Sequence, residues 1–266
     1  MERFESIVSR ENPVIKNIVK LISSAKERRR RSLFVTEGAR LCGEIPNSKI
    51  TAEIFAVSES ALKKEELTAR SISASAARSI VIPDALFSKI SDTKTPQGML
   101  CVCKIPKVAP FSGNGSYIAL ENTQDPSNLG AVARTAEAFG IDGIIVSKNG
   151  CDPYSPKAQR AGMGALLRLP VETAEDFLLS VKEKANRGAR IYGAAVDDGA
   201  QNILKTDFSG NTVILIGNEA NGLTDEAKAL CDRLVKIPMP GRAESLNASV
   251  AAAVFMWEVL KSHNGQ

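Results

Sequence analysis

The chain has 266 residues, of which 44% are apolar and 24% are charged, the composition of a globular protein with one large or two modest domains. No low-complexity tract, glycine period or sustained heptad occurs, which excludes the disordered, collagen-like and coiled-coil classes. No apolar run reaches about eighteen residues, and residues 1–16 lack the pattern of a secretory signal, so neither a membrane span nor export is expected.

The cysteine and histidine content excludes several kinds of catalytic site. The only histidine is His263, and the cysteines form an odd set without CxxC spacing. We therefore expect no metal site, and no hydrolase that depends on a Ser-His-Asp or Cys-His pair. Cys101 and Cys103 are two positions apart and would share one face of a strand. Buried free thiols of this kind are typical of a cytoplasmic protein.

The charge is distributed unevenly along the chain. The net charge is +4 overall, but residues 1–108 carry +7 and residues 109–266 carry −3. A basic first half joined to a slightly acidic second half indicates that the first half binds a polyanion.

The first half alternates between helical and extended patterns. An apolar series from Val14 to Ile22 at helical spacing predicts a short amphipathic helix, and a basic run over residues 26–31 follows it. Strands are then expected at residues 50–57, 79–82 and 99–102, and helices at 60–69 and 84–90. This order predicts a small α/β sandwich.

A linker and a second α/β unit follow. Residues 104–116 contain two prolines and two glycines, so we divide the chain into domains at 1–108 and 117–266, joined by a linker at 109–116. In the second domain, strands are expected at 117–120, 143–146, 190–196, 212–216 and 234–237, with helices at 129–139, 174–186, 225–231 and 247–261. Such alternation predicts a mostly parallel sheet with ligands at the carboxyl ends of its strands.

Three polar, glycine-bearing patches follow strands of this second domain. In the first, the Asp125-Pro126 turn leads to Asn128, which we predict to be the N-cap of a helix that begins with an anion site. Arg134 lies four residues after Gly130, on the same helix face, and could contact a phosphate or a developing oxyanion. An ordinary capped helix with one solvated arginine would give the same pattern.

The second and third patches are also ambiguous when taken alone. The second joins a strand to Gly217 and Gly222, whose backbone could surround a small ligand, but a simple turn capped by Thr224 looks the same. Neither a Walker A sequence nor GxGxxG occurs there. The third patch crowds Ser245, Asn247 and Ser249 at the start of a helix, which equally fits an N-cap cluster.

Together, in this order, the three patches resemble one family closely, the SpoU (TrmH-type) branch of the SPOUT superfamily of RNA methyltransferases. The family's first motif, N-x-x-D-P-x-N-x-G-x-x-x-R-T-A, matches residues 122–136 throughout. The second, G-N-E-G-x-G-L, matches residues 217–223 except at Ala220. The third, I-P-M-x-G-x-x-x-S-L-N-V-S-V-A, matches residues 237–251 except at Ala248.

Two further segments resemble parts of the same family. Residues 155–165 are similar to its connecting segment, with Gly162 where serine is common. The first half resembles, through residues 9–13 and 34–38, the ribosomal-protein-like α/β domain with which many members hold RNA. The resemblance therefore makes Arg10 and the basic run candidate RNA contacts, the run through Arg28, Arg29, Arg30 and Arg31.

The resemblance implies a trefoil-knotted second domain that binds S-adenosylmethionine and works as a homodimer. By position, backbone groups of Gly217, Ile237 and Leu246 would hold this cofactor, and Asn218, Glu219 and Met239 would complete the pocket. The implied reaction transfers a methyl group to a ribose 2′-hydroxyl of RNA.

The implied catalytic residues are Arg134, Asn122, Ser245 and Asn247. Arg134 would activate the hydroxyl, although a guanidinium is a poor base, so that orienting a phosphate and stabilising the nascent alkoxide fit it better. The other three would position the substrate or the neighbouring loops. Ribosomal RNA is favoured over transfer RNA. A non-catalytic RNA-binding protein, or an enzyme that uses a nucleotide for other chemistry, are the alternatives.

Overall fold

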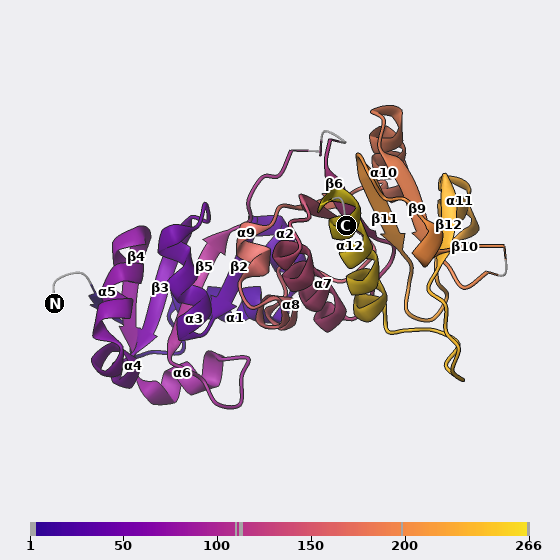
Figure 1. The fold of residues 1–266 in the computed structure, drawn as a ribbon. Helices are drawn as coiled ribbons and strands as arrows, with labels where there is room; N and C mark the ends of the chain where they lie inside the picture. The colour runs from indigo at the N-terminus through magenta and orange to yellow at the C-terminus, as the bar shows by residue number, and fades with distance from the viewer. Residues whose placement is uncertain (1–3, 110, 112–113, 198, 265–266) are drawn as a thin grey trace. The chain divides into compact units, whose positions relative to one another are not determined.

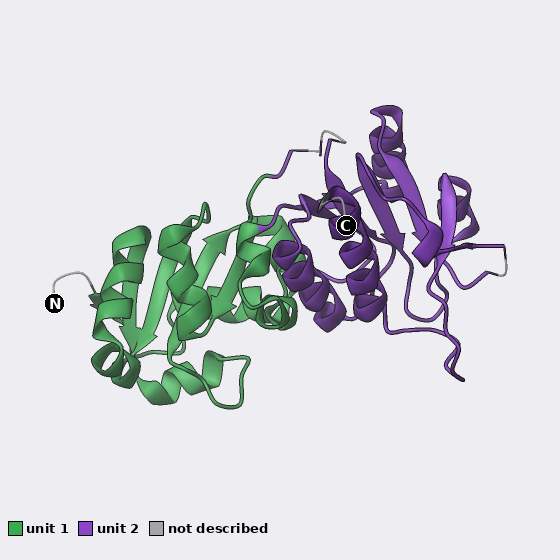
Figure 2. Cartoon of the chain, in the orientation of Figure 1, with its two compact units in different colours: residues 1–107, 154–168 green, residues 108–153, 169–266 purple. Residues whose placement is uncertain are grey.

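The computed structural model describes residues 4–109, 111, 114–197 and 199–264, and divides into two compact units (Figure 2). The first comprises residues 1–107 and 154–168, and the second comprises residues 108–153 and 169–266. The expected linker at 109–116 includes Pro110, Ser112 and Gly113, which lie outside the described residues. The described residues of this segment, which include Phe111 and residues 114–116, belong to the second unit.

The first unit contains a mixed five-stranded sheet in the order β1-β4-β3-β5-β2. Strands β1, β4 and β3 run parallel to one another, whereas β5 is antiparallel to both β3 and β2. The strands are β1 Phe4–Ser6, β2 Leu33–Glu37, β3 Ala52–Ser58, β4 Ala76–Ile82 and β5 Met99–Lys104. The helices are α1 Pro13–Ser23, α2 Ala25–Arg31, α3 Ala39–Glu44, α4 Glu59–Lys64, α5 Glu66–Ser75, α6 Asp84–Ile90, α8 Pro156–Gly162 and α9 Ala165–Arg168.

Both faces of this sheet are buried, which confirms the predicted α/β sandwich. Cys101 and Cys103 point to one face of β5, as expected, and pack in a core that includes side chains of α3 and α5. Leu100 and Val102 point to the other face, where α1 and α6 contribute the core. Tyr154, which precedes α8, and Leu167 of α9 also pack in this unit.

Helix α1 forms where the apolar series predicts it. Asn12 caps its first turn by accepting a hydrogen bond from the Val14 N–H at 2.9 Å, and Pro13 occupies the first helical position. Ser24 ends α1 and caps α2, so the basic run continues as a second helix. The helix expected at residues 60–69 is instead divided into α4 and α5 at Glu65.

The second unit contains a parallel seven-stranded sheet in the order β10-β12-β9-β11-β6-β7-β8, which confirms the predicted parallel topology. Its strands are β6 Ser116–Leu120, β7 Gly143–Ser147, β8 Val171–Ala174, β9 Arg190–Ala194, β10 Gln201–Asn202, β11 Thr212–Ile216 and β12 Arg233–Lys236. Its helices are α7 Pro126–Ala138, α10 Phe177–Asn186, α11 Asp225–Ala229 and α12 Ala248–Asn264. Helices α7 and α12 lie side by side (Figure 1), and the rings of Phe139 and Trp257 meet at 5.7 Å.

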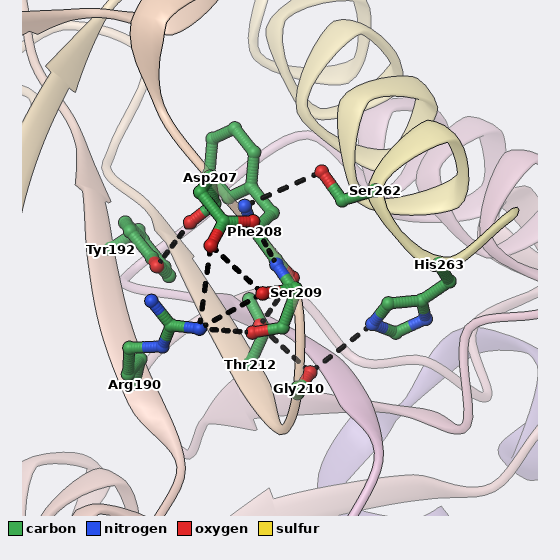
Figure 3. Close-up of polar contacts among 9 residues, drawn as sticks. All are labelled: Arg190, Tyr192, Asp207, Phe208, Ser209, Gly210, Thr212, Ser262 and His263. Carbon is green, nitrogen blue, oxygen red and sulfur yellow. Dashed lines mark hydrogen bonds and ion pairs between the residues drawn. The ribbon is translucent and has the colours of Figure 1, made fainter. Parts of the chain in front are cut away.

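The amino ends of β9 and β11 are held by a polar network (Figure 3). Tyr192 donates to the Asp207 carbonyl at 2.7 Å, and Ser262 of α12 accepts from the Phe208 N–H at 3.4 Å. His263 lies 3.1 Å from the Gly210 carbonyl oxygen in the same network. The single histidine therefore fixes the end of α12 at the sheet edge opposite to the strand ends that the three patches follow.

Neither a membrane-spanning helix nor a cluster of metal ligands occurs in the part of the chain that the structure describes. None of its helices is long and apolar enough to cross a membrane. Within the same residues, no group of histidine, cysteine and acidic side chains is arranged to hold a metal ion.

Candidate active site

A cavity of about 340 Å³ lies at the carboxyl ends of β9, β11 and β12. Its walls come from the last residue of β9 and the residues that follow the three strands, namely Ala194–Asp197, Gly217–Leu223 and the Ile237–Leu246 loop. Phe255 of α12 contributes a further side. The second and third sequence patches therefore face one space, as expected for loops at the same edge of a parallel sheet.

The second patch is a tight loop closed by its own backbone. Asn218 and Gly222 exchange two backbone hydrogen bonds of 2.9 Å, and Gly222 has a φ of +68° that favours glycine. A Cβ atom on Gly217 would lie only 2.1 Å from the carbonyl carbon of Gly222. Glycine is thus required at position 217 because the loop folds back on itself. Thr224 then caps α11, as the simpler interpretation of this patch predicted.

One side chain of the first patch connects all three patches. The Asn128 amide donates to Glu219 Oε1 at 2.9 Å, and its carbonyl oxygen accepts from Asn247 Nδ2 at 3.1 Å. The prediction that Asn128 caps α7 was wrong, because Asp125 is the N-cap and accepts from the Ser127 N–H at 2.9 Å. Asn128 lies within the first turn, buried, and its amide is free to bridge the second and third patches.

Glu219 joins the cavity to the start of α7. Besides the Asn128 amide, its carboxylate accepts the backbone N–H groups of Gln124 at 3.2 Å and Asp125 at 3.4 Å. Partial burial raises the pKa of Glu219, but these hydrogen bonds together outweigh it and lower the pKa below its ordinary value. The side chain is therefore a carboxylate at neutral pH.

Glu121 and Asn122, the first two residues after β6, bind residues of the second patch and the Thr224 that follows it. The buried Glu121 carboxylate accepts both the Thr224 N–H at 2.9 Å and the Thr224 hydroxyl at 2.7 Å. The Asn218 amide donates to the Asn122 carbonyl at 2.9 Å. The Asn122 side chain itself contacts Ser147 Oγ at 3.1 Å. Sequence reasoning gave Glu121 no role, although an acidic residue directly after a buried strand was a signal.

The third patch combines capping with cavity lining. Asn247 Oδ1 accepts the Ser249 N–H at 2.9 Å and thereby caps α12, while its amide reaches Asn128. Ser245 and Leu246 line the cavity, and so do Ile237 and Met239. All six predicted cofactor residues lie in the wall of this cavity: Gly217, Asn218, Glu219, Ile237, Met239 and Leu246.

Arg134 lies elsewhere. It is exposed on α7, it does not line the cavity, and none of the described residues makes a hydrogen bond or ion pair with its guanidinium. Within one chain, the structure therefore brings the three loops together without placing this guanidinium among them.

The basic residues of the first unit have different environments. Arg10 and Arg29 are exposed. Arg30 and Arg31 pair with the Glu27 carboxylate at 2.8 and 3.0 Å. Arg28 is only 5% exposed and donates to the Leu21 carbonyl at 2.6 Å and the Ile22 carbonyl at 3.0 Å, close to the end of α1. Its predicted role as an RNA contact does not fit this burial, since the guanidinium supports the fold.

The fold and the cavity define a class: a parallel α/β domain whose small-ligand site is built from three loops at one sheet edge. The family model of the SpoU rRNA Methylase family matches residues 115–257, more than half of the chain. The chain belongs to this family. Residues 12–101 match the MRM3-like substrate binding domain.

Similar proteins include enzymes with named RNA substrates. The chain is 29% identical to the 23S rRNA (guanosine(2553)-2′-O)-methyltransferase RlmP of Bacillus subtilis, over 96% of this chain and 99% of that protein. It is 34% identical to the 23S rRNA (guanosine-2′-O-)-methyltransferase RlmB of Xanthomonas axonopodis, over 59% of this chain and 63% of the relative. The crystal structure of an AdoMet-bound rRNA methyltransferase from Sinorhizobium meliloti superposes with a TM-score of 0.84 at 27% identity, covering 97% of each chain.

The cavity has the chemistry to hold S-adenosylmethionine (AdoMet). Leu223, Ile237 and Leu246 offer apolar surface for an adenine ring. Among the described residues, its lining includes three carboxylate residues, Asp197, Glu219 and Glu244, but a single cationic one, Lys228. AdoMet carries a sulfonium, an ammonium and a carboxylate, so its net positive charge complements this lining.

Proposed function

We propose that this chain transfers a methyl group from AdoMet to a ribose 2′-hydroxyl of ribosomal RNA. The observation that carries the proposal is the Asn128 junction, which joins the first family motif to the second and third motifs that line the cavity. Family membership and the nearly full-length similarity to a 23S rRNA 2′-O-methyltransferase support the reaction and favour ribosomal over transfer RNA.

Bound AdoMet would supply an electrophilic methyl group on its sulfonium. Backbone groups of Gly217, Ile237 and Leu246 hold the adenosine part in this proposal, and the apolar side chains of the latter two cover the adenine. The Glu219 carboxylate lies in the same wall and favours a cationic ligand. Asn218 and Met239 complete the pocket.

We assign four residues to the RNA that accepts the methyl group, namely Arg134, Asn122, Ser245 and Asn247. A guanidinium stays protonated in proteins, so we assign Arg134 to orienting an RNA phosphate and stabilising the developing alkoxide. The Asn247 side chain contacts Asn128, and the Asn122 side chain contacts Ser147. We therefore assign both asparagines to positioning the loops of the site. Ser245 lines the cavity and is exposed, which suits a contact with substrate.

We propose that the protein works as a homodimer in which Arg134 serves the cavity of the other copy. Arg134 is exposed outside its own cavity, and α12 exposes Val250 and Trp257, each at 49%. Apolar side chains of this size on a helix surface are typical of an interface.

Subunit complementation tests this arrangement. Arg134→Ala and Leu246→Arg should each be inactive alone. Mixed after co-refolding they should recover about a quarter of the wild-type rate, because half the dimers are mixed and each would hold one intact site. An inactive mixture that contains heterodimers by mass would place Arg134 in its own cavity.

The first unit would hold the RNA. Its match to a substrate binding domain and the excess of basic residues over residues 1–108 support this role. Arg10, Arg29 and Arg30 are the exposed candidates, and Arg30 and Arg31 are available through exchange of their partner Glu27. Arg10→Gln with Arg29→Gln should weaken RNA binding and flatten its salt dependence, whereas Arg70→Gln, an exposed arginine paired with Glu66, should change neither.

Two further expectations belong to this proposal. We infer a trefoil knot in the second unit from family membership, and a reducing cytoplasmic setting from the five free cysteines. Protease fragments that stay threaded after cleavage of a single loop would support the knot.

The decisive experiment for the activity uses radiolabelled AdoMet with ribosomal and transfer RNA, followed by mapping of 2′-O-methyl sites. Label in ribosomal RNA at a ribose is the expected result. Label only in transfer RNA would show that transfer RNA, and not ribosomal RNA, is the substrate. RNA binding without transfer, or preference for other nucleotides over AdoMet, would refute the proposed reaction.

A further inference from the structure

An ion pair in the cavity wall has no role in the function proposed above. Lys228 of α11 lies with its Nζ atom 3.2 Å from Oδ2 of Asp197, which follows β9. Both residues line the cavity, and their side chains are 30% and 45% exposed. Among the described residues of the lining, Lys228 is the only lysine or arginine.

We propose that this pair recognises the amino-acid end of AdoMet, with Lys228 binding the α-carboxylate and Asp197 the α-ammonium. The inference rests on the proposed use of AdoMet. A zwitterion presents an anion and a cation on one carbon, and the Lys228–Asp197 pair presents the complementary charges side by side. An ammonium point charge on a flexible stem can turn from the protein carboxylate to a ligand carboxylate.

The other charged groups of the wall are less suited to this task. The Glu219 carboxylate is already engaged by Asn128 and the backbone of Gln124 and Asp125. Glu244 cannot bind a carboxylate, since it carries the same charge. No other lysine or arginine of the described lining remains for the ligand anion.

Sheet order places the pair at the side of the cavity remote from the first motif. Strand β9 lies beyond β11, which separates it from β6 and the loop that begins α7. The amino-acid end would therefore point away from the Asn128 junction and from the loop that leads to Arg134. The fold itself depends little on the pair, because partly exposed ion pairs contribute little stability.

Titration calorimetry on the full chain tests the proposal with two ligands that differ in one group, AdoMet and decarboxylated AdoMet. The wild type should bind AdoMet roughly tenfold more tightly than the decarboxylated compound, the size of one charge-assisted contact. Lys228→Gln should lower the affinity for AdoMet by that factor and leave the affinity for the decarboxylated compound unchanged. The variant should therefore no longer discriminate between the two ligands. Lys205→Gln, a neutralised exposed lysine outside the cavity lining, should behave as wild type.

Each other outcome has a defined meaning. Discrimination that survives in Lys228→Gln overturns the proposal, because the carboxylate then binds elsewhere. Equal weakening of both ligands also overturns it, since Lys228 would contact the adenosine part. 5′-Methylthioadenosine, which lacks the amino-acid end, should bind Lys228→Gln and Asp197→Asn as tightly as it binds the wild type. That result would show that both substitutions leave the cavity intact. A wild type that binds no AdoMet would refute the proposed function itself.

Discussion

Replacing Asn128 by alanine tests the junction on which the site depends. The substitution removes one hydrogen bond to the charged Glu219 and one from Asn247, both around 3 Å in length. A bond to a charged group contributes about 1.5–3 kcal/mol and a neutral one about 1 kcal/mol, so we expect a loss of about 3 kcal/mol in unfolding free energy. In a unit of this size that corresponds to a decrease in Tm of roughly 6–12 °C.

The assay is denaturant unfolding together with AdoMet titration. The variant should bind AdoMet more weakly, because Glu219 and the loop preceding Asn247 both lie in the cavity wall. Ser127→Ala, the neighbouring position in the same helical turn, is the matched control, since only its backbone N–H bonds to Asp125.

A double-mutant cycle separates the junction from general damage. Asn128→Ala combined with Asn247→Ala should destabilise less than the sum of the single variants, by about 1 kcal/mol, because both remove the same bond. Strict additivity would refute the reasoning, since it would mean that the two amides do not interact in solution. An unchanged AdoMet affinity in Asn128→Ala would separately refute its role in shaping the cavity.

Three further variants or conditions test other parts of the structure. Gly217→Ala should weaken AdoMet binding at least tenfold by calorimetry, because its Cβ would overlap the Gly222 backbone, whereas Gly241→Ala, with open space around it, should bind normally. Arg28→Ala should lower the unfolding free energy by about 2–3 kcal/mol, as it leaves two helix-end carbonyls without their charged donor, while Arg10→Ala, a change at an exposed arginine, should stay within about 0.5 kcal/mol. Because the pKa of Glu219 is lowered in the folded state, its contribution to stability is complete above the unfolded value near 4.5 and is lost as pH falls through the folded pKa; Glu219→Gln should therefore flatten the acid limb of a stability–pH profile.

Much of this arrangement could be predicted from local sequence. Short apolar runs identified β6, β7, β9, β11 and β12 of the second unit, and a parallel sheet requires the ends of its strands to share one edge. That rule alone predicts that the loops at Gly217 and Ile237 face the same space, which the cavity confirms. The short edge strands β1, β8 and β10 were missed, because two to four residues carry too little periodicity.

Side-chain partners across long sequence separations could not be predicted. Asn128 looks like an N-cap because its residue type fits, but its bonds reach residues 91 and 119 positions away, and Asp125 caps the helix instead. Arg28 looks like its neighbours in the basic run, yet helical spacing turns it inward. The segment Tyr154–Arg168 lies within the second half of the sequence but packs in the first unit, a tertiary choice without a local signal.

The same carboxylate that faces the cavity also binds the residues directly before α7. Glu219 accepts the backbone N–H groups of Gln124 and Asp125, which precede the helix, and the Asn128 amide within its first turn, so the cavity wall and the start of the helix share one charged group. Arg134 is carried by this helix, although its side chain lies outside the cavity. Each sequence patch alone fits an ordinary turn or cap. Their interpretation as one site depends on the bond between Glu219 and Asn128, which also contacts Asn247. Binding and transfer should therefore both respond to Glu219, whereas only transfer should respond to Arg134.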